Sequence, residues 1–559
     1  MTQTSDDKTQ ADELFVKGLQ HHERGQLAEA SKIYQDALKL HREHFDALHM
    51  LGVVALQSGQ SEEGVKLIEI ALSFNPSHSA AQGHLGNGLR SLERFDEALS
   101  SFDKAIELNP NNSLALYNQG FVLSELKRFE DAVESYGKAI SVNPDHADAY
   151  YERGNALRML GRRDEAISAF DEAIAINPNF AGAYANRGVV LSELNRKDEA
   201  LASYEKAIDL NPNKADAYNN RANILYDLMR LKEAASDYEK ALELAADNDD
   251  IRWNLSQCHL LQGNFESGWQ LYEARSKTGK GTPARHFEQP LWNGETDISG
   301  KTLFVYWEQG FGDTIQFSRY VRELKNLGVN TILQVERPLV DVMKDLEPYC
   351  QIIGDDETPA GFDFHCSLMS LPLAFKTNLE TLANDATYLS SRPELVEKWF
   401  DQLGPKKSSR VGLVWSGSDT HHDDAKRSIA LSQLSPLLRD DVEFISLQVG
   451  TRLADLETAQ GMPELNLIGS EISDFADTAA LIDLMDLVIT VDTAVAHLAG
   501  AMGKPVWVLL PYQPDWRWLT EREDSPWYTS VRLFRQPEMG DWASVIDRVS
   551  GELSSFIEG

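Results

Sequence analysis

Residues 113–144 read SLALYNQGFVLSELKRFEDAVESYGKAISVNP, and this stretch decides the fold of the first half of the chain. Apolar residues recur at helical spacing through 113–126 and again through 129–142, with a Lys-Arg turn between the two segments. Such spacing predicts two amphipathic helices joined by a tight turn. The Asn143-Pro144 pair then ends the second helix, because proline does not continue one. The stretch is therefore expected to form a helical hairpin.

The same unit recurs along the chain with a fixed period. Asn-Pro pairs begin at Asn75, Asn109, Asn143, Asn177 and Asn211, each 34 residues after the one before. Three positions with small residues and one with a large apolar residue share this spacing, and in the quoted unit they are Gly120, Ala132, Ala139 and Tyr136. Small residues let the two helices approach closely, and the aromatic ring fills the remaining space. Such units stack because none buries its apolar face alone.

This pattern resembles the tetratricopeptide repeat, a helix–turn–helix unit of the same length. The resemblance covers about residues 11–278, which is roughly eight repeats. Residues 1–10 are expected to be disordered. Stacked repeats form a superhelix, so we expect an α-solenoid. The last repeat is degenerate, with Ser256 at the first small position and no proline, as suits a capping unit.

A polar position recurs on the first helix of the repeats, which lines the concave face in this family. It holds Asn118, Asn186, Asn220 and Asn254. An amide both donates and accepts, which suits the backbone of an extended peptide. The alternative is a solvated polar face, which concave surfaces need in any case. The layout resembles nucleocytoplasmic protein O-GlcNAc transferases, in which an Asn ladder precedes a glycosyltransferase domain. We therefore expect these residues to bind an acceptor protein.

Composition narrows the class of protein. Of 559 residues 42% are hydrophobic and 25% charged, as in ordinary globular proteins. A net charge of −34 argues against nucleic acid as a partner, because phosphate neutralisation needs excess Lys and Arg. Three widely spaced cysteines indicate neither a disulfide framework nor a zinc site. The sequence shows no signal peptide or membrane span, so a cytoplasmic location is expected.

After Arg275 the period changes to short apolar runs separated by helical segments. A linker is expected near 276–283, and strands are expected at 302–307, 331–335, 411–415, 442–447, 487–491 and 506–510. Continuous apolar strands alternating with helices indicate parallel sheets covered on both faces. The polar stretch PKKSSR divides this half into 279–405, an acceptor-side lobe, and 406–559, a nucleotide-sugar lobe with a closing helix. We expect a GT-B-like pair of Rossmann-type lobes.

A glycine-rich turn follows the first expected strand. It reads Gln309-Gly310-Phe311-Gly312-Asp313-Thr314 and opens a helix. Glycines let the backbone approach a ligand, and Asp313 lies at the carboxyl edge of the sheet, where α/β proteins bind ligands. The alternative is an ordinary helix cap. Glu308 is a second carboxylate at the same strand end.

Two further strand ends carry groups suited to phosphate. The strand 487–491 passes into Asp492-Thr493 and a helix with His497 one turn on, where free amides and the helix dipole favour a pyrophosphate. The strand 411–415 leads to a loop whose cations suit a departing diphosphate. The alternatives are a structural histidine and a solvated loop. The donor-binding set is predicted as Ser416, Gly417, Lys426, Gln448, Asp492, Thr493 and His497.

Together these sites resemble the ADP-heptose-dependent lipopolysaccharide heptosyltransferases, over about residues 298–540. The resemblance implies that Asp313 is the catalytic base and that Lys426 and the run 492–499 bind donor phosphate. Ala494 replaces the glycine usual in that run. Bacterial proteins joining tetratricopeptide repeats to such a domain are familiar as protein glycosyltransferases, including flagellin-modifying ones.

The sequence thus predicts an inverting, metal-independent glycosyltransferase. It would move a sugar from a nucleotide-diphosphate donor to a hydroxyl of a protein recruited by the repeats, with flagellin as one candidate. No cofactor and no metal ligands are predicted. Two alternatives stay open: a non-catalytic repeat scaffold with a degenerate transferase domain, and a glycolipid or lipopolysaccharide glycosyltransferase.

Overall fold

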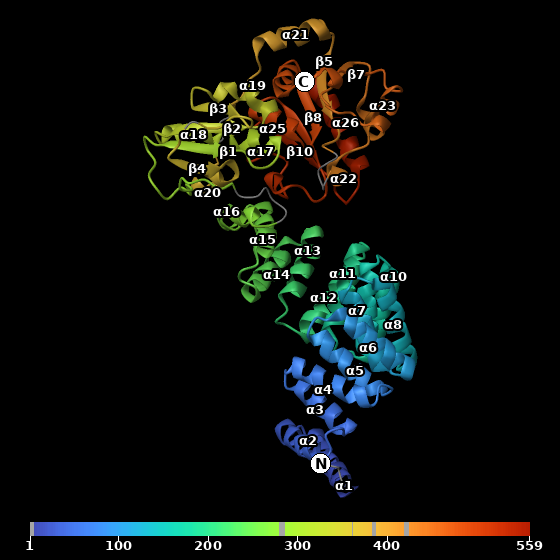
Figure 1. Ribbon diagram of the computed structural model, residues 1–559. Helices are drawn as coiled ribbons and strands as arrows, with labels where there is room; N and C mark the ends of the chain where they lie inside the picture. Colours follow the sequence, from blue (N-terminus) through green and yellow to red (C-terminus); the bar gives the residue numbers. More distant parts are fainter. Residues whose placement is uncertain (1–4, 279–284, 360, 383–386, 419–423, 559) are drawn as a thin grey trace. The chain divides into compact units, whose positions relative to one another are not determined.

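The computed structural model describes residues 5–278, 285–359, 361–382, 387–418 and 424–558. The chain divides into two compact units, Met1–Ile224 and Leu225–Gly559. The division passes through a helix of the repeat region, so the last repeats belong to the same unit as the α/β part (Figure 1). Within the described ranges, no helix is long and apolar enough to cross a membrane.

Sixteen helices and a short 3₁₀ turn form the repeat region, as the period predicts. They are α1 Ser5–Glu23, α2 Leu27–Leu40, α3 Phe45–Gln57, α4 Ser61–Phe74, α5 Ser79–Ser91, α6 Phe95–Leu108, α7 Ser113–Glu125, α8 Phe129–Val142, α9 Ala147–Met159, α10 Arg163–Ile176, α11 Ala181–Glu193, α12 Lys197–Leu210, α13 Ala215–Asp227, α14 Leu231–Leu244, α15 Asp249–Leu261, α16 Phe265–Tyr272 and η1 Glu273–Ser276. The α-solenoid is confirmed.

The repeated residues explain how each hairpin packs. Ala132 and Tyr136 of α8 are fully buried. A Cβ atom added to Gly86 would lie 2.6 Å from the Phe102 ring, so this crossing of helices requires glycine. Asn143 is the C-cap of α8, where the proline that follows stops the helix.

The first helix begins earlier than the repeat pattern suggests. Helix α1 starts at Ser5, inside the segment 1–10 expected to be disordered, while residues 1–4 lie outside the described ones. Asp6 and Asp7 stand in its first turn, where negative charge favours a helix N-terminus. Residues 5–10 therefore extend the first helix of the first repeat.

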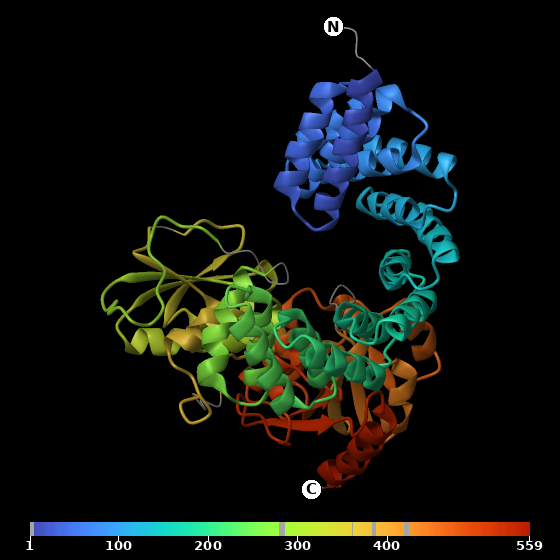
Figure 2. The ribbon, with the colours of Figure 1, turned by 90° about the horizontal axis from the view of Figure 1, so that it is seen from below.

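Two parallel sheets form the α/β part of the second unit, in yellow-green and in orange to red (Figure 2). The first has the order β3-β2-β1-β4 and the second β10-β9-β8-β5-β6-β7. The strands are β1 Thr302–Tyr306, β2 Asn330–Val335, β3 Cys350–Gly354, β4 Phe364–Ser367, β5 Ser409–Val414, β6 Val442–Ser446, β7 Leu465–Leu467, β8 Leu487–Val491, β9 Val506–Leu510 and β10 Val531–Arg535. All six predicted strands are present, and we call the two sheets with their helices the first and second lobes.

Short helices connect the strands and cover the sheets. They are α17 Phe311–Phe317, α18 Tyr320–Asn326, α19 Val340–Met343, α20 Leu371–Ala374, α21 Pro393–Leu403, α22 Asp424–Arg427, α23 Leu453–Ala459, α24 Phe475–Asp483, α25 Ala494–Ala501 and α26 Trp542–Glu558, with the 3₁₀ turn η7 Trp516–Trp518 among shorter turns. Val545 and Val549 of α26 join the core of the second lobe, so this helix packs against that lobe. Most of the predicted linker lies outside the described residues.

Candidate active site

Asp313 stands at the carboxyl end of β1, on the first turn of α17. One of its oxygens, Oδ2, accepts a hydrogen bond from the amide of Gly310 at 2.9 Å, so the helix-cap role is real. The other oxygen, Oδ1, accepts from the guanidinium of Arg517. The Asp313 side chain is 18% exposed. Burial raises the pKa of Asp313, and the positive charge of Arg517 opposes that rise.

Arg517 links the two lobes. It lies on η7 of the second lobe, and its Nε donates to Gln316 Oε1 on α17 at 2.9 Å. Its Nη1 donates to Asp515 Oδ1 at 2.8 Å, and its guanidinium lies 4.2 Å from the centre of the Trp516 ring. The sequence presents this residue only as an arginine between two tryptophans, a run that suits stacking on a sugar or base as well as packing between lobes.

The N-terminus of α25 lies against α17. Thr493 is the N-cap of α25, and its Oγ1 lies 3.1 Å from Thr490 Oγ1. A Cβ atom added to Gly312 would lie 2.9 Å from Cδ2 of His497, so glycine lets the two helices meet. The structure therefore brings the Gly-Asp turn and the Asp492-Thr493 helix start together.

His497 is enclosed by protein. Its Nδ1 lies 3.0 Å from the hydroxyl of Tyr528, and its ring stacks on Trp518 with centroids 5.2 Å apart. Burial and the charges of nearby arginines, Arg517 first among them, hold the pKa of His497 well below its usual value. The imidazole is therefore neutral, and it supplies hydrogen bonds rather than charge.

Arg427 is the cation that contacts the start of α25. Its Nη1 donates to the backbone oxygen of Asp492 at 3.0 Å. A Cβ atom at Gly417 would lie 2.5 Å from Arg427 Nη2, so this glycine makes room for the guanidinium. Lys426, the predicted phosphate ligand, is exposed on the same short helix. Burial and Asp515 raise the pKa of Asp492 to about 6, against the effect of Arg427.

Gln448 and Ser416 shape the end of β5. Gln448 Oε1 accepts from the amides of Trp415 and Ser416 at 3.3 and 3.1 Å. Both Ser416 and Gln448 are buried. These two predicted donor-binding residues thus hold the turn that carries Gly417, whose amide donates to Ser428 Oγ at 3.1 Å.

Glu308, the other carboxylate near β1, is paired with a residue of the last repeat. It forms a bidentate ion pair with Arg275 of η1, with Nε–Oε1 and Nη2–Oε2 distances of 2.9 Å each. Glu308 also accepts from the hydroxyl of Ser367. Its carboxylate is therefore committed to structure, which leaves Asp313 as the better candidate for a base.

The predicted acceptor-binding amides lie on first helices of their repeats. Asn186 Nδ2 donates to Asn155 Oδ1 at 2.7 Å, so amides of neighbouring repeats are linked. Asn118 is buried, and Asn220 is half-buried beside Asn219. Asn254 is half-buried and belongs to the second unit.

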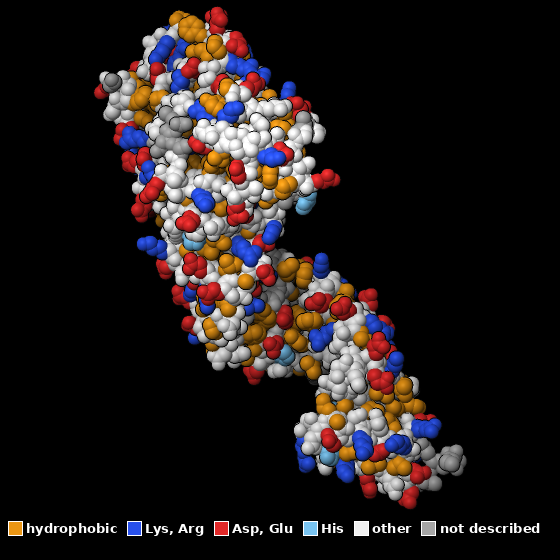
Figure 3. Space-filling model, turned by 90° about the vertical axis from the view of Figure 1, so that its left-hand side faces the viewer, with side chains coloured by type: hydrophobic (Ala, Val, Ile, Leu, Met, Phe, Trp, Pro, Cys, Tyr) orange, Lys and Arg blue, Asp and Glu red, His pale blue; other side chains and the backbone are white. Residues whose placement is uncertain are grey.

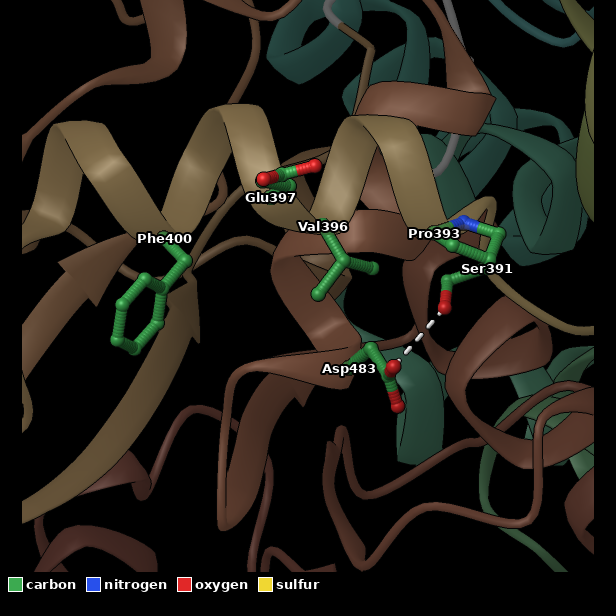
Figure 4. A pocket seen from close by; sticks show the side chains of 6 residues that line it. All are labelled: Ser391, Pro393, Val396, Glu397, Phe400 and Asp483. Carbon is green, nitrogen blue, oxygen red and sulfur yellow. Dashed lines mark hydrogen bonds between the residues drawn. The ribbon is translucent and has the colours of Figure 1, made fainter.

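One surface pocket is lined by none of the site residues described above. A pocket of about 490 Å³ lies along α21 and is lined by Val396, Phe400 and Asp483, among others (Figure 4). Asp483 accepts there from Ser391 Oγ at 2.9 Å.

Acidic and basic side chains are interspersed over the face drawn in Figure 3. In the described part of the chain, no group of three or more His, Cys, Asp or Glu is arranged to hold a metal ion.

Comparisons with known families agree with both halves of the fold. Models of the tetratricopeptide repeat match residues 16–79, 79–112, 117–179, 181–214 and 215–248. The model of glycosyltransferase family 9 (heptosyltransferase) matches residues 452–531, which include α25 and Arg517. The chain therefore carries tetratricopeptide repeats and a C-terminal glycosyltransferase family 9 domain, as the resemblances predicted.

Individual proteins match over part of their length. Protein FlbA of Caulobacter vibrioides is 28% identical over 330 residues, which are 53% of this chain and 54% of FlbA. The chain thus spans about half the length of this curated relative. The structure of MamA is 31% identical, over 29% of this chain and 95% of MamA, with a TM-score of 0.28. YrrB, described as a repeat protein with an unusual peptide-binding site, is 24% identical over 33% of this chain and 95% of its own, with a TM-score of 0.30.

Proposed function

We propose that this protein is an inverting glycosyltransferase that transfers a sugar from a nucleotide-diphosphate donor to a hydroxyl group of a protein bound by the repeats. The family 9 domain supports sugar transfer, and the repeats support a protein partner. The observation that carries the proposal is the meeting of two strand ends. A carboxylate from the first lobe and a helix N-terminus from the second lobe lie at one place, through the contact of Gly312 with His497.

In this proposal Asp313 is the general base. As the acceptor oxygen forms its bond to the anomeric carbon, the bond from that carbon to the diphosphate oxygen breaks. The acceptor's proton passes to the Asp313 carboxylate. A single displacement of this kind inverts the anomeric centre. Arg517 supports the role because its charge favours the ionised carboxylate in a half-buried position.

The leaving diphosphate would gather its charge at the start of α25. Amides at a helix N-terminus bind anions, and Thr493 adds a hydroxyl. Arg427 already contacts the backbone of Asp492, and the exposed Lys426 lies next to it in sequence. We assign to these cations the charge compensation that a metal ion gives other transferases. Turnover by enzyme treated with EDTA should then equal that of untreated enzyme.

The acceptor is proposed to be a protein because a repeat solenoid precedes the transferase, and the linked amides Asn155 and Asn186 offer groups for a peptide backbone. No comparison favours flagellin over another acceptor, so the assay assumes no particular acceptor protein. The full chain is incubated with isotopically labelled nucleotide sugars of several bases and sugars, together with protein and lipid fractions of a bacterial extract.

Label in the protein fraction, with release of nucleoside diphosphate, is the expected result. Label confined to lipid would make the protein a glycolipid transferase. Calorimetry with a panel of nucleoside diphosphates completes the test. A chain that binds none of them would be a scaffold with a degenerate transferase domain, and the proposal would be wrong.

A further inference from the structure

The last repeat is built into the transferase. Trp269 of α16 is 1% exposed, and its indole Nε1 donates to the backbone oxygen of Thr377 at 3.0 Å. Its ring centre lies 5.1 Å from that of Trp516 on η7. Helix α16 also lies beside α20 of the first lobe (Figure 1). The repeat therefore packs against elements of both lobes within the second unit.

Two side chains of this repeat contact the turn that leads from β1 to α17, residues 307–310. Arg275 forms the bidentate pair with Glu308, and its side chain is 3% exposed. The Tyr272 hydroxyl accepts from Gln309 Nε2 at 3.2 Å. The Arg275 guanidinium also donates to Ser370 Oγ, at 2.7 Å, and to Glu273 Oε1, at 2.6 Å, which fixes its position. Two successive residues of the turn are thus tied to the repeat.

The turn leads directly to the proposed base. Gly310 follows Gln309, and its amide is the group that caps Asp313 Oδ2. Any shift of Glu308 and Gln309 therefore moves the amide that orients the Asp313 carboxylate. A buried ion pair adds little stability over an apolar contact, because desolvation offsets the attraction. The two parallel hydrogen bonds of this pair do fix the orientation of the Glu308 side chain, and so hold the turn in one position.

We infer that Tyr272 and Arg275 are positioning residues for Asp313, so that the terminal repeat is part of the catalytic apparatus as well as of the solenoid. The inference rests on the proposed function of Asp313. The competing explanation is that these contacts only attach the repeat to the domain. The bond from Trp269 to Thr377 separates the two explanations, because it attaches the same repeat without touching the turn.

The test compares three conservative variants of the full chain: Tyr272→Phe, Arg275→Lys and, as the control, Trp269→Phe. Tyr272→Phe and Arg275→Lys should lower kcat by about tenfold or more, since small misplacements of a catalytic group are costly. Their affinity for nucleoside diphosphate should stay unchanged. Trp269→Phe keeps an aromatic ring against Trp516 and removes the bond to Thr377, so it should lower the thermal midpoint by at least as much while kcat is retained. Normal kcat in both turn variants, or an equal loss of kcat in all three, overturns the inference.

A double variant tests whether Arg275 acts through its contact with Glu308. Combining Arg275→Lys with Glu308→Gln should lower kcat no further than the stronger single change, and additive losses would contradict the inference. Asp313→Asn, measured alongside, separates this inference from the proposal beneath it. If Asp313→Asn is inactive while the turn variants are normal, only the positioning role is wrong. Normal turnover in Asp313→Asn removes the base and the positioning role together.

Discussion

Asp313 divides its two oxygens between a backbone amide and a guanidinium, and this division makes its chemistry testable. Asp313→Asn keeps the size of the side chain and an oxygen that caps Gly310. Stability should therefore fall little, while the rate should fall ~100-fold or more because the general base is lost. Single-turnover transfer and thermal unfolding of the same samples provide the check. Turnover close to that of the wild type would show that Asp313 is only a helix cap.

Arg517 should set the pH at which Asp313 becomes ionised. Its charge opposes the rise in pKa that burial causes, so Arg517→Gln should raise the pKa of Asp313 further. Since the base acts deprotonated, the acid limb of the kcat/KM profile should move to higher pH, by ~1 unit or more. An equivalent change at the exposed Arg337 is the control. An unmoved acid limb would exclude Asp313 as the titrating group.

Glu336 offers a prediction about stability. It lies just after β2 and accepts from Thr314 Oγ1 at 2.7 Å, and burial raises its pKa to about 7. A raised carboxyl pKa means that the folded state holds the proton more tightly than the unfolded state. The contribution of Glu336 is thus fully present below pH ~4.5 and is lost as the pH rises through about 7.

Glu336→Gln removes this titration while keeping an acceptor for Thr314. At pH 8 the variant should be more stable than the wild type by up to about 3 kcal/mol, and the difference should shrink towards pH 5. Denaturant unfolding at both pH values measures it. A constant difference across the range would mean that Glu336 does not titrate on unfolding.

At the scale of elements, α25 should act as the diphosphate site through its first turn. Thr493→Val keeps the shape of the N-cap residue and removes its hydroxyl, so the dissociation constant of a nucleoside diphosphate should rise ~10-fold. Thr331→Val, on β2 of the first lobe, is the control because it makes the same change at a buried hydroxyl outside the second lobe. Calorimetry that finds equal affinity in the Thr493 variant would place the diphosphate elsewhere.

The elements that the sequence predicted are those with an unambiguous pattern. The 34-residue period predicts the helices of the solenoid, and continuous apolar runs predict strands such as β8 and β9. Strands β3, β4, β7 and β10 were not predicted. Strand β7 has only three residues, and Arg532 and Arg535 interrupt the apolar run of β10. No local pattern distinguishes such strands from loops, since their place in the sheet comes from pairing with β6 and β9.

The residues of the candidate site were predicted only where a local sequence pattern marks them. Strand ends that pass into helices are visible in the sequence, and they led to Asp313, through a glycine-rich turn, and to Thr493, through an Asp-Thr pair. The partner of Asp313 comes from the other lobe, 204 residues along the chain, and only the fold brings Arg517 to it. The sequence likewise does not distinguish Lys426 from Arg427, whereas in the structure Arg427 donates to the backbone of Asp492 and Gly417 leaves room for its guanidinium.

At the scale of the whole molecule, the recurring asparagines of the repeats should determine acceptor binding without affecting donor affinity. Changing Asn118, Asn186, Asn220 and Asn254 to Ala in the full chain should raise KM for the protein acceptor and leave nucleoside diphosphate affinity unchanged. Asn111, Asn179 and Asn213, exposed in the turns between repeats, are the matched control set. If the two sets of variants have the same KM for the protein acceptor, the four recurring asparagines are only part of a solvated face.

The docking of α16 also limits how such proteins are recombined. Repeat arrays are attractive parts for retargeting an enzyme, and the end of the period near residue 278 invites a crossover there. A crossover at that point would replace Trp269, Tyr272 and Arg275 with residues of another protein, and their contacts with the transferase would be lost. Chimaeras joined in the turn between α14 and α15 instead would keep the native final hairpin, so new recognition arrays are best spliced upstream of Asp249.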